Sequence, residues 1–127
     1  MDIILLIGRI LIGAVFLLSG IGHLKDRKLT ARMAAAAGVP APQLLSFVSS
    51  MLTVFGGLSL TLGFHVEIGV VLLLLFLLPV TFAMHPFWKS ADPMEAGNQQ
   101  GHFMKNIALS GALLVFLYFG SGPFSLG

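Results

Sequence analysis

The chain has 127 residues, of which 57% are hydrophobic and only 9% charged, and its mean hydropathy is +0.98. A water-soluble domain could not bury so much apolar surface, so the composition excludes a soluble globular protein and predicts one all-α integral membrane domain over residues 1–127. The 7 Lys and Arg stand beside apolar runs, which favours membrane anchoring over nucleic-acid binding, and the absence of Cys excludes disulfides and thiolate metal sites.

Four apolar stretches predict a bundle of four transmembrane helices, near residues 3–24, 43–63, 67–85 and 104–121. Each is close to the ~20 residues that carry a helix across ~30 Å of hydrocarbon. The N-terminus lacks the positively charged segment of a cleavable signal peptide, so the first stretch is expected to remain as a helix.

The connecting segments differ in character. The first loop carries the basic run 25–32 and then an alanine-rich segment that ends at Gly38 and Pro40, which predicts a short interfacial helix. Residues 63–65 are expected to form a tight turn, and residues 86–101, rich in Gly, Pro and amides, a polar loop.

The basic residues are distributed unevenly between the two sides of the predicted bundle. Six lie in or beside the first and third loops, whereas Arg9 falls inside the first span. By the positive-inside rule, loops 1 and 3 are cytoplasmic and both termini are outside, in a multi-pass protein of a bacterial cytoplasmic (inner) membrane. The six residues are Lys25, Arg27, Lys28, Arg32, Lys89 and Lys105.

Two helix faces are expected to pack against other helices. In the second span Thr53, Gly57 and Thr61 form a series of small residues four apart, which permits close helix approach. In the first span five residues share one stripe at helical spacing. They are Arg9, Gly13, Phe16, Gly20 and His23.

Arg9 is the most informative single residue of the first span, because a guanidinium at that depth must be paired or must snorkel to the interface. Glu67 opens the third span on the same side of the membrane. An intramembrane Arg9–Glu67 ion pair is therefore a hypothesis, with simple snorkelling of Arg9 as the alternative.

Six polar residues gather at the predicted cytoplasmic ends of the first, third and fourth spans, and they form the candidate ligand site. Imidazoles at that depth can donate to a quinone carbonyl, relay protons or bind metal, and an indole can stack on a flat ring. The simpler alternative is that these rings occupy the interfacial belt. No metal-binding motif or catalytic triad occurs, so no metal site is predicted. The six residues are His23, His85, Trp88, His102, Lys105 and Asn106.

An ordered set of motif residues extends across all four spans. Its opening part is Gly8-Arg9 with the stripe that follows, and its second-helix part is the diglycine Gly56-Gly57. Its most specific part is His85-Pro86-Phe87-Trp88 followed by residues 103–111, Phe-Met-Lys-Asn-Ile-Ala-Leu-Ser-Gly. In this order the residues resemble the DoxX family of small four-helix membrane proteins.

The resemblance implies a membrane subunit or anchor of an oxidoreductase or oxidative-stress system, with a soluble or membrane partner on the cytoplasmic loops and a quinone as the possible ligand. No intrinsic cofactor is evident in the sequence. Alternatives are a small-molecule carrier or channel, which four spans would build only as a homo-oligomer, and a non-catalytic assembly partner. The chain has His23 where many family members have Lys, and Thr53 where many have Glu.

Overall fold

The computed structural model describes residues 2–120 and 122, and every regular element in that part of the chain is helical. Four helices are long and apolar enough to cross a membrane: α1 (Asp2–Lys25), α3 (Pro42–Leu62), α4 (Val66–Met84) and α5 (Pro93–Phe119). A ten-residue helix, α2 (Arg27–Ala36), follows α1, and a short 3-10 helix, η1 (Phe87–Lys89), connects α4 to α5. The predicted all-α fold with four spans and a helix in the first loop is confirmed.

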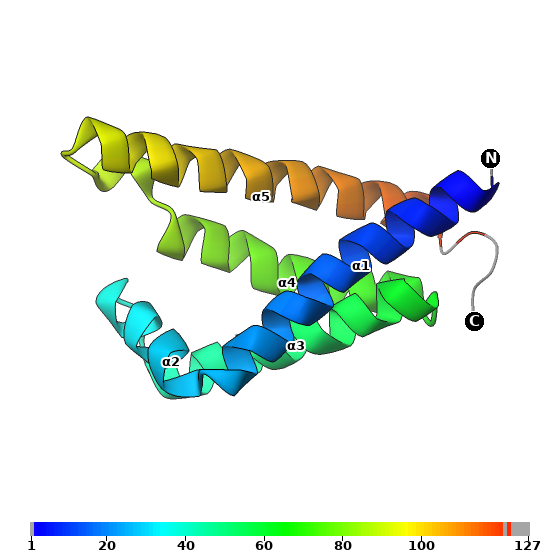
Figure 1. Cartoon of the computed structure of the whole chain (residues 1–127), viewed down its shortest axis with the longest axis horizontal. Coiled ribbons are helices and arrows are strands. Elements are labelled where there is room, and N and C mark those ends of the chain that lie inside the picture. The colour runs from blue at the N-terminus through cyan, green and yellow to red at the C-terminus, as the bar shows by residue number, and fades with distance from the viewer. Residues whose placement is uncertain (1, 121, 123–127) are drawn as a thin grey trace.

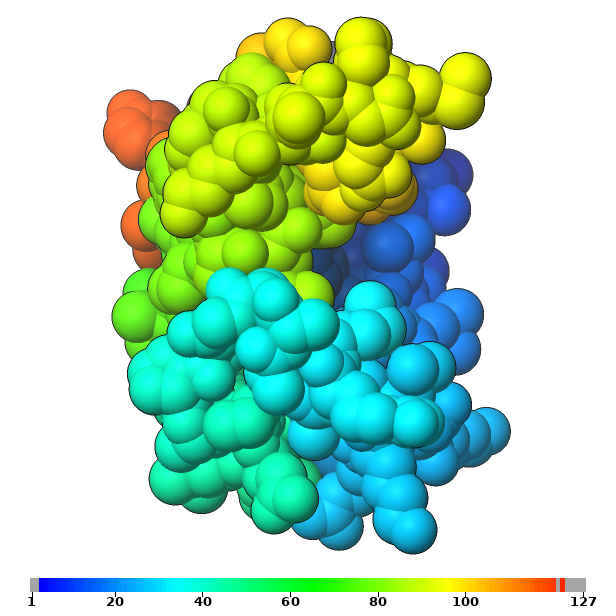
Figure 2. All heavy atoms as spheres, turned by 90° about the vertical axis from the view of Figure 1, so that its left-hand side faces the viewer, coloured from blue at the N-terminus to red at the C-terminus, as the bar shows by residue number. Residues whose placement is uncertain are grey.

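The long helices form a row of neighbours in which α1 packs on α3, α3 on α4 and α4 on α5, while α2 packs against α3. The start of α1 and the end of α5 lie at one end of the molecule, and α2 and η1 lie at the other (Figure 1). Seen from the α2 end, α2 and the α4–α5 connection flank a recess with α1 at its back (Figure 2).

Glycines bring the helix backbones of α1, α3 and α4 close together. A Cβ atom added at Gly13 would lie 2.8 Å from the carbonyl oxygen of Gly57 and 2.6 Å from the backbone nitrogen of Thr61. The adjacent Gly56 faces α4 instead, where an added Cβ would lie 3.0 Å from the carbonyl oxygen of Gly69. Successive helical residues point ~100° apart, so the diglycine gives α3 a close contact with two different neighbours.

The predicted packing faces are confirmed. On α1, Arg9 and Phe16 are almost fully buried, as are the two glycines of the stripe, and His23 is half-buried. Thr53 on α3 is also fully buried. Four buried hydroxyl groups on α3, α4 and α5 each donate to the backbone carbonyl four residues earlier. The protein therefore buries these hydroxyls without the loss of a hydrogen bond. These residues are Ser50, Thr53, Thr81 and Ser110.

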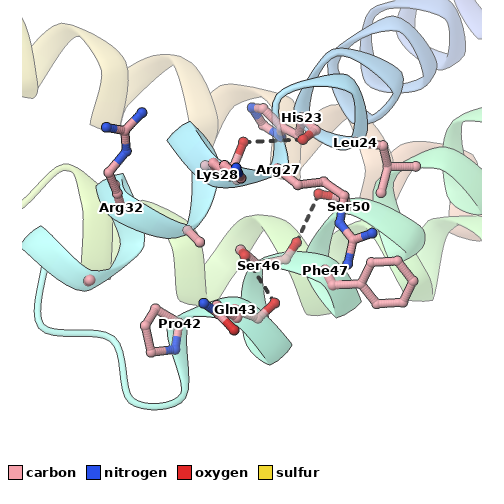
Figure 3. A pocket seen from close by; sticks show the side chains of 13 residues that line it. His23, Leu24, Arg27, Lys28, Arg32, Pro42, Gln43, Ser46, Phe47 and Ser50 are labelled. Carbon is pink, nitrogen blue, oxygen red and sulfur yellow. Dashed lines mark hydrogen bonds between the residues drawn. The ribbon is translucent and has the colours of Figure 1, made fainter.

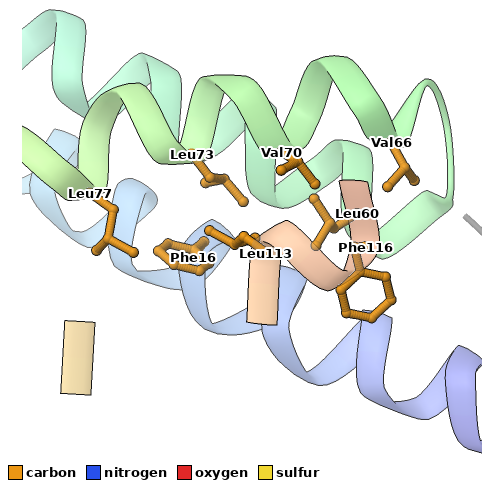
Figure 4. Packing of buried hydrophobic residues seen from close by; sticks show 8 residues of the cluster. All are labelled: Phe16, Leu60, Val66, Val70, Leu73, Leu77, Leu113 and Phe116. Carbon is orange, nitrogen blue, oxygen red and sulfur yellow. The ribbon is translucent and has the colours of Figure 1, made fainter. Parts of the chain in front are cut away.

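One apolar cluster receives side chains from all four long helices (Figure 4). Because lipid tails are as apolar as leucine, close packing rather than escape from water holds these side chains together. Its members are Phe16, Leu60, Val66, Val70, Leu73, Leu77, Leu113 and Phe116.

The predicted polar loop 86–101 is wrong over its second half, because α5 already begins at Pro93. The backbone N–H of Met94 donates to the side chain of Asp92 at 3.4 Å, Pro93 occupies the first helical position, and Glu95 stands in the first turn. These are strong helix-start signals, and they prevail over the low helix propensity of the glycines that follow. The 27 residues of α5 extend about 40 Å, so its first turns project beyond the hydrocarbon.

Candidate functional site

The structure separates the six candidate residues into two groups. His85, Trp88, His102, Lys105 and Asn106 lie on the end of α4, on η1 and on the first half of α5. His23 lies at the end of α1, where it lines a pocket formed with α2 and α3. The group on α4, η1 and α5 forms the candidate ligand site, and the pocket beside His23 is separate from it.

Four aromatic side chains form one wall of the candidate site, with Phe103 at the centre. Its ring centroid lies 5.2 Å from that of Phe82, 5.4 Å from Phe87 and 5.7 Å from Trp88. The rings meet at interplanar angles of 85°, 74° and 86°, the edge-to-face geometry that aromatic pairs prefer. Phe82 and Trp88 are each 53% exposed, so the wall offers flat apolar surface to a ligand or to lipid.

Two histidines lie close to the aromatic wall along the chain, His85 two residues before Phe87 and His102 next to Phe103. The imidazole rings of His85 and His102 are stacked, with centroids 5.0 Å apart and an interplanar angle of 25°. The Nδ1 atom of His85 lies 2.6 Å from the side-chain oxygen of Gln99, and the amide nitrogen of Gln99 donates to Glu95 at 2.9 Å. Helix α5 therefore supplies both the stacking partner and the hydrogen-bonding partner of His85. Together, His85, His102 and the four rings of the wall are called the aromatic–histidine cluster below.

This chain of hydrogen bonds assigns the tautomer of His85. The carboxylate of Glu95 only accepts, so Gln99 must present its NH2 group to Glu95 and its oxygen to His85. The Nδ1 atom of His85 consequently carries the proton and donates it to Gln99. The Nε2 atom keeps a lone pair when the ring is neutral and becomes a second donor when the ring is protonated.

The remaining two candidates differ in exposure. Lys105 is exposed on the outer face of α5. Asn106 is only 6% exposed and stands one turn beyond His102, and its side-chain amide makes no hydrogen bond to any residue in the described part of the chain. A buried amide of this kind offers both a donor and an acceptor to a ligand that reaches it.

Within residues 2–120 and 122, no group of three or more His, Asp or Glu side chains is arranged to hold a metal ion. The stacked pair of histidines stands with an amide and aromatic rings instead. Hydrogen bonding and ring stacking are therefore the chemistry that these side chains offer.

The other candidate site concerns Arg9 and Glu67. Arg9 is 1% exposed, so protein covers its side chain, whereas Glu67 is exposed in the first turn of α4. A Cβ added at Gly120 would lie 3.6 Å from a carboxylate oxygen of Glu67, which places Glu67 beside the end of α5. The Arg9–Glu67 ion pair stays a prediction.

Sequence reasoning missed Glu95, Gln99 and the phenylalanines of the aromatic wall. The signal for the polar pair was present, because residues 95, 99, 102 and 106 follow the 4-3-4 spacing of one helical face. The fourth helix was predicted to start near residue 104, and the residues before it were assigned to a loop. The helical spacing of residues 95, 99 and 102 was therefore not recognised.

Four membrane-spanning helices with a histidine- and aromatic-lined end define a small polytopic membrane protein. Comparison with known proteins gives its family: residues 4–86 match the family model described as DoxX, and the chain belongs to the DoxX family. The chain is similar to the inner membrane protein YphA of Escherichia coli (strain K12), with 27% identity over 124 residues, or 98% of this chain and 88% of the relative. No solved structure matches the chain.

Proposed function

We propose that this protein is a membrane subunit of an oxidoreductase system and that it binds a quinone, or a similar flat apolar ligand, at the aromatic–histidine cluster. The observation that carries this proposal is the hydrogen-bond chain Glu95–Gln99–His85, which orients one imidazole at the same end of the molecule as the exposed aromatic wall. A quinone ring stacks on such a wall. Its carbonyl oxygens accept hydrogen bonds from the imidazole of His102, from the side-chain amide of Asn106 or, when its ring is protonated, from Nε2 of His85.

The position of the cluster supports a role as a presenting subunit. Phe82 lies at the end of α4, whereas Phe87 and Trp88 lie beyond it, so the cluster reaches from the hydrocarbon boundary into the polar connection. A quinone held there would be within reach of both lipid and a partner protein. The chain has no cysteine, so a partner of the flavin- or metal-containing class would supply the electrons that reduce the quinone to a quinol.

Quinone binding can be measured directly because Trp88 is the only tryptophan of the chain. A short-chain ubiquinone titrated into the protein in nanodiscs is expected to quench Trp88 fluorescence with saturation. We expect His85→Asn and His102→Asn to weaken binding about tenfold each, the equivalent of roughly 1.4 kcal/mol and of one lost hydrogen bond or ring contact.

The matched control is His65→Asn, because His65 is exposed in the α3–α4 turn at the other end of the molecule and its positive φ of 46° is one that asparagine tolerates. This variant should bind like the wild type. Quenching that does not saturate, or that is the same in all four proteins, would contradict the proposal and assign the rings to the interfacial belt. Co-purification of a quinone from native membranes, lost in His85→Ala/Trp88→Ala, is the second expected result.

We also propose that the α2 end faces the cytoplasm in a bacterial inner membrane, the location that the name of the YphA relative gives for that protein. Since the chain has no cysteine, single-cysteine variants report orientation without background. Phe64→Cys should react with a membrane-impermeant maleimide in spheroplasts. Ala91→Cys should react only after permeabilisation, and the reverse pattern would overturn this orientation.

A further inference from the structure

A pocket of about 760 Å³ lies at the α2 end of the molecule, separate from the aromatic–histidine cluster. The end of α1, one face of α2 and the start of α3 enclose it (Figure 3). Its charged lining consists of Arg27, Lys28 and Arg32, with His23 beside them and no carboxylate. The pocket therefore carries a concentrated positive charge where the first two spans meet the membrane surface.

The hydroxyl groups of the pocket are already engaged within the protein. Thr30 donates to the backbone oxygens of Asp26 and His23, Ser46 donates to Gln43, and Ser50 donates to Ser46. The donors that remain for a ligand are therefore the three cationic side chains, the amide of Gln43 and the imidazole of His23.

The cations repel one another. Lys28 and Arg32 are four residues apart on α2, a spacing that brings like charges together, and Arg27 and Lys28 stand in the first turn, where the helix dipole is also positive. Across residues 2–120 and 122, none of the three forms an ion pair with a carboxylate. A bound anion would relieve this repulsion.

A second, apolar hollow adjoins the pocket at Phe47. The guanidinium of Arg27 lies 5.0 Å from the ring centroid of Phe47, and Phe47 also begins this second hollow of about 350 Å³ along α3. The residues that line this second hollow are all apolar, and they reach Phe55, two helical turns or about 12 Å further into the membrane. A cationic pocket with an apolar hollow next to it matches a ligand with an anionic head and a hydrocarbon tail.

We propose that this pocket binds the phosphate headgroup of an anionic phospholipid, with an acyl chain along the apolar hollow from Phe47 to Phe55. Arg27, Lys28 and Arg32 are exposed, so their side chains can turn toward the phosphate, and Gln43 and His23 add hydrogen-bond donors. Spans that end at Lys25 and begin again at Pro42 hold the pocket at headgroup level. The assignment is independent of quinone binding, since the two sites share no residue.

Native mass spectrometry of the full-length protein, incubated with equal amounts of phosphatidylglycerol and phosphatidylcholine, tests the proposal. The wild type is expected to retain phosphatidylglycerol preferentially. The variant Arg27→Gln/Lys28→Gln/Arg32→Gln should lose this preference by roughly 100-fold, since each hydrogen bond from a cation of the pocket to the phosphate contributes about fivefold. Phe47→Ala/Phe55→Ala should weaken retention of long-chain phosphatidylglycerol more than that of a dihexanoyl form.

The charge-matched control is Lys25→Gln/Lys89→Gln/Lys105→Gln, which removes three positive charges from the same end of the molecule without touching the pocket. It should keep the preference within about twofold. An equal loss in the control, or no preference in the wild type, would overturn the site. Displacement of the lipid by inorganic phosphate at the same concentration would overturn the lipid assignment and leave a site for the free anion.

Discussion

Replacing Gly13 by leucine is expected to destabilise the folded bundle by roughly 3 kcal/mol or more, at or above the upper end of the usual range for overpacking. The atoms nearest to an added Cβ belong to α3, and two of them are backbone atoms, the nitrogen of Thr61 and the carbonyl oxygen of Gly57. Backbone cannot move aside as a flexible side chain can, so α1 and α3 must separate. The measurement is the temperature at which half of the purified protein remains monodisperse in detergent.

Gly22→Leu is the matched control for this experiment. Gly22 lies on the same helix but is exposed, and an added Cβ would meet nothing within 4 Å. The control should unfold within about 0.5 kcal/mol of the wild type, as exposed substitutions usually do. Equal destabilisation by both substitutions would show that leucine harms α1 itself and that the α1–α3 contact is not responsible.

The fold could be predicted from the sequence because a membrane limits the possible structures so strongly. Apolar runs long enough to span hydrocarbon must be helical, since no water is present to satisfy exposed backbone groups. The small residues at 53, 57 and 61 identified the α3 face that meets α1, because only small side chains let two helices approach so closely. Composition and spacing carry this information without any knowledge of the partners.

The candidate site was less predictable, because it depends on where α5 begins. The apolar run identifies the part of α5 that crosses hydrocarbon, but its first turns lie in the polar region, where hydropathy carries no signal. Only the capping residues Asp92 and Pro93 mark the true start. The contact between Gln99 and His85, fourteen residues apart, also requires the tertiary arrangement of α4 and α5.

Thr53 occupies a buried packing position on α3. Its side chain is fully buried and its hydroxyl donates to the backbone oxygen of Ser49 at 2.7 Å, so it acts as a small packing residue between helices. The resemblance to the DoxX family implies a Glu at this position in many members, whereas this chain has Thr53 there and no carboxylate. Chemistry that needs a charged group in that interface is therefore absent from the position, and the ionisable groups of the candidate site lie at the ends of α4 and α5.

Arg9→Met is expected to destabilise the protein by about 1.5–3 kcal/mol, the range for losing hydrogen bonds to a charged group. Glu67 is exposed, so its carboxylate would stay solvated after the substitution. Arg9 is 1% exposed, and methionine preserves much of its length without the charge. The predicted partner is Glu67. Both residues belong to the same end of the molecule, since Gly8 approaches Phe116 and Glu67 approaches Gly120, one helical turn further along the chain.

A double-mutant cycle with Glu67→Gln isolates the pair, read out as unfolding free energy in mixed micelles. If the charges interact, the double variant should be more stable than the sum of the two single losses by at least about 1 kcal/mol. Glu95→Gln provides the control, because Glu95 lies at the far end of α5 and should add to Arg9→Met within about 0.5 kcal/mol. Additivity of Arg9→Met and Glu67→Gln would exclude the pair. The burial of Arg9 would then have to be explained by contacts other than Glu67, because a side chain that is 1% exposed does not escape to the interface by snorkelling.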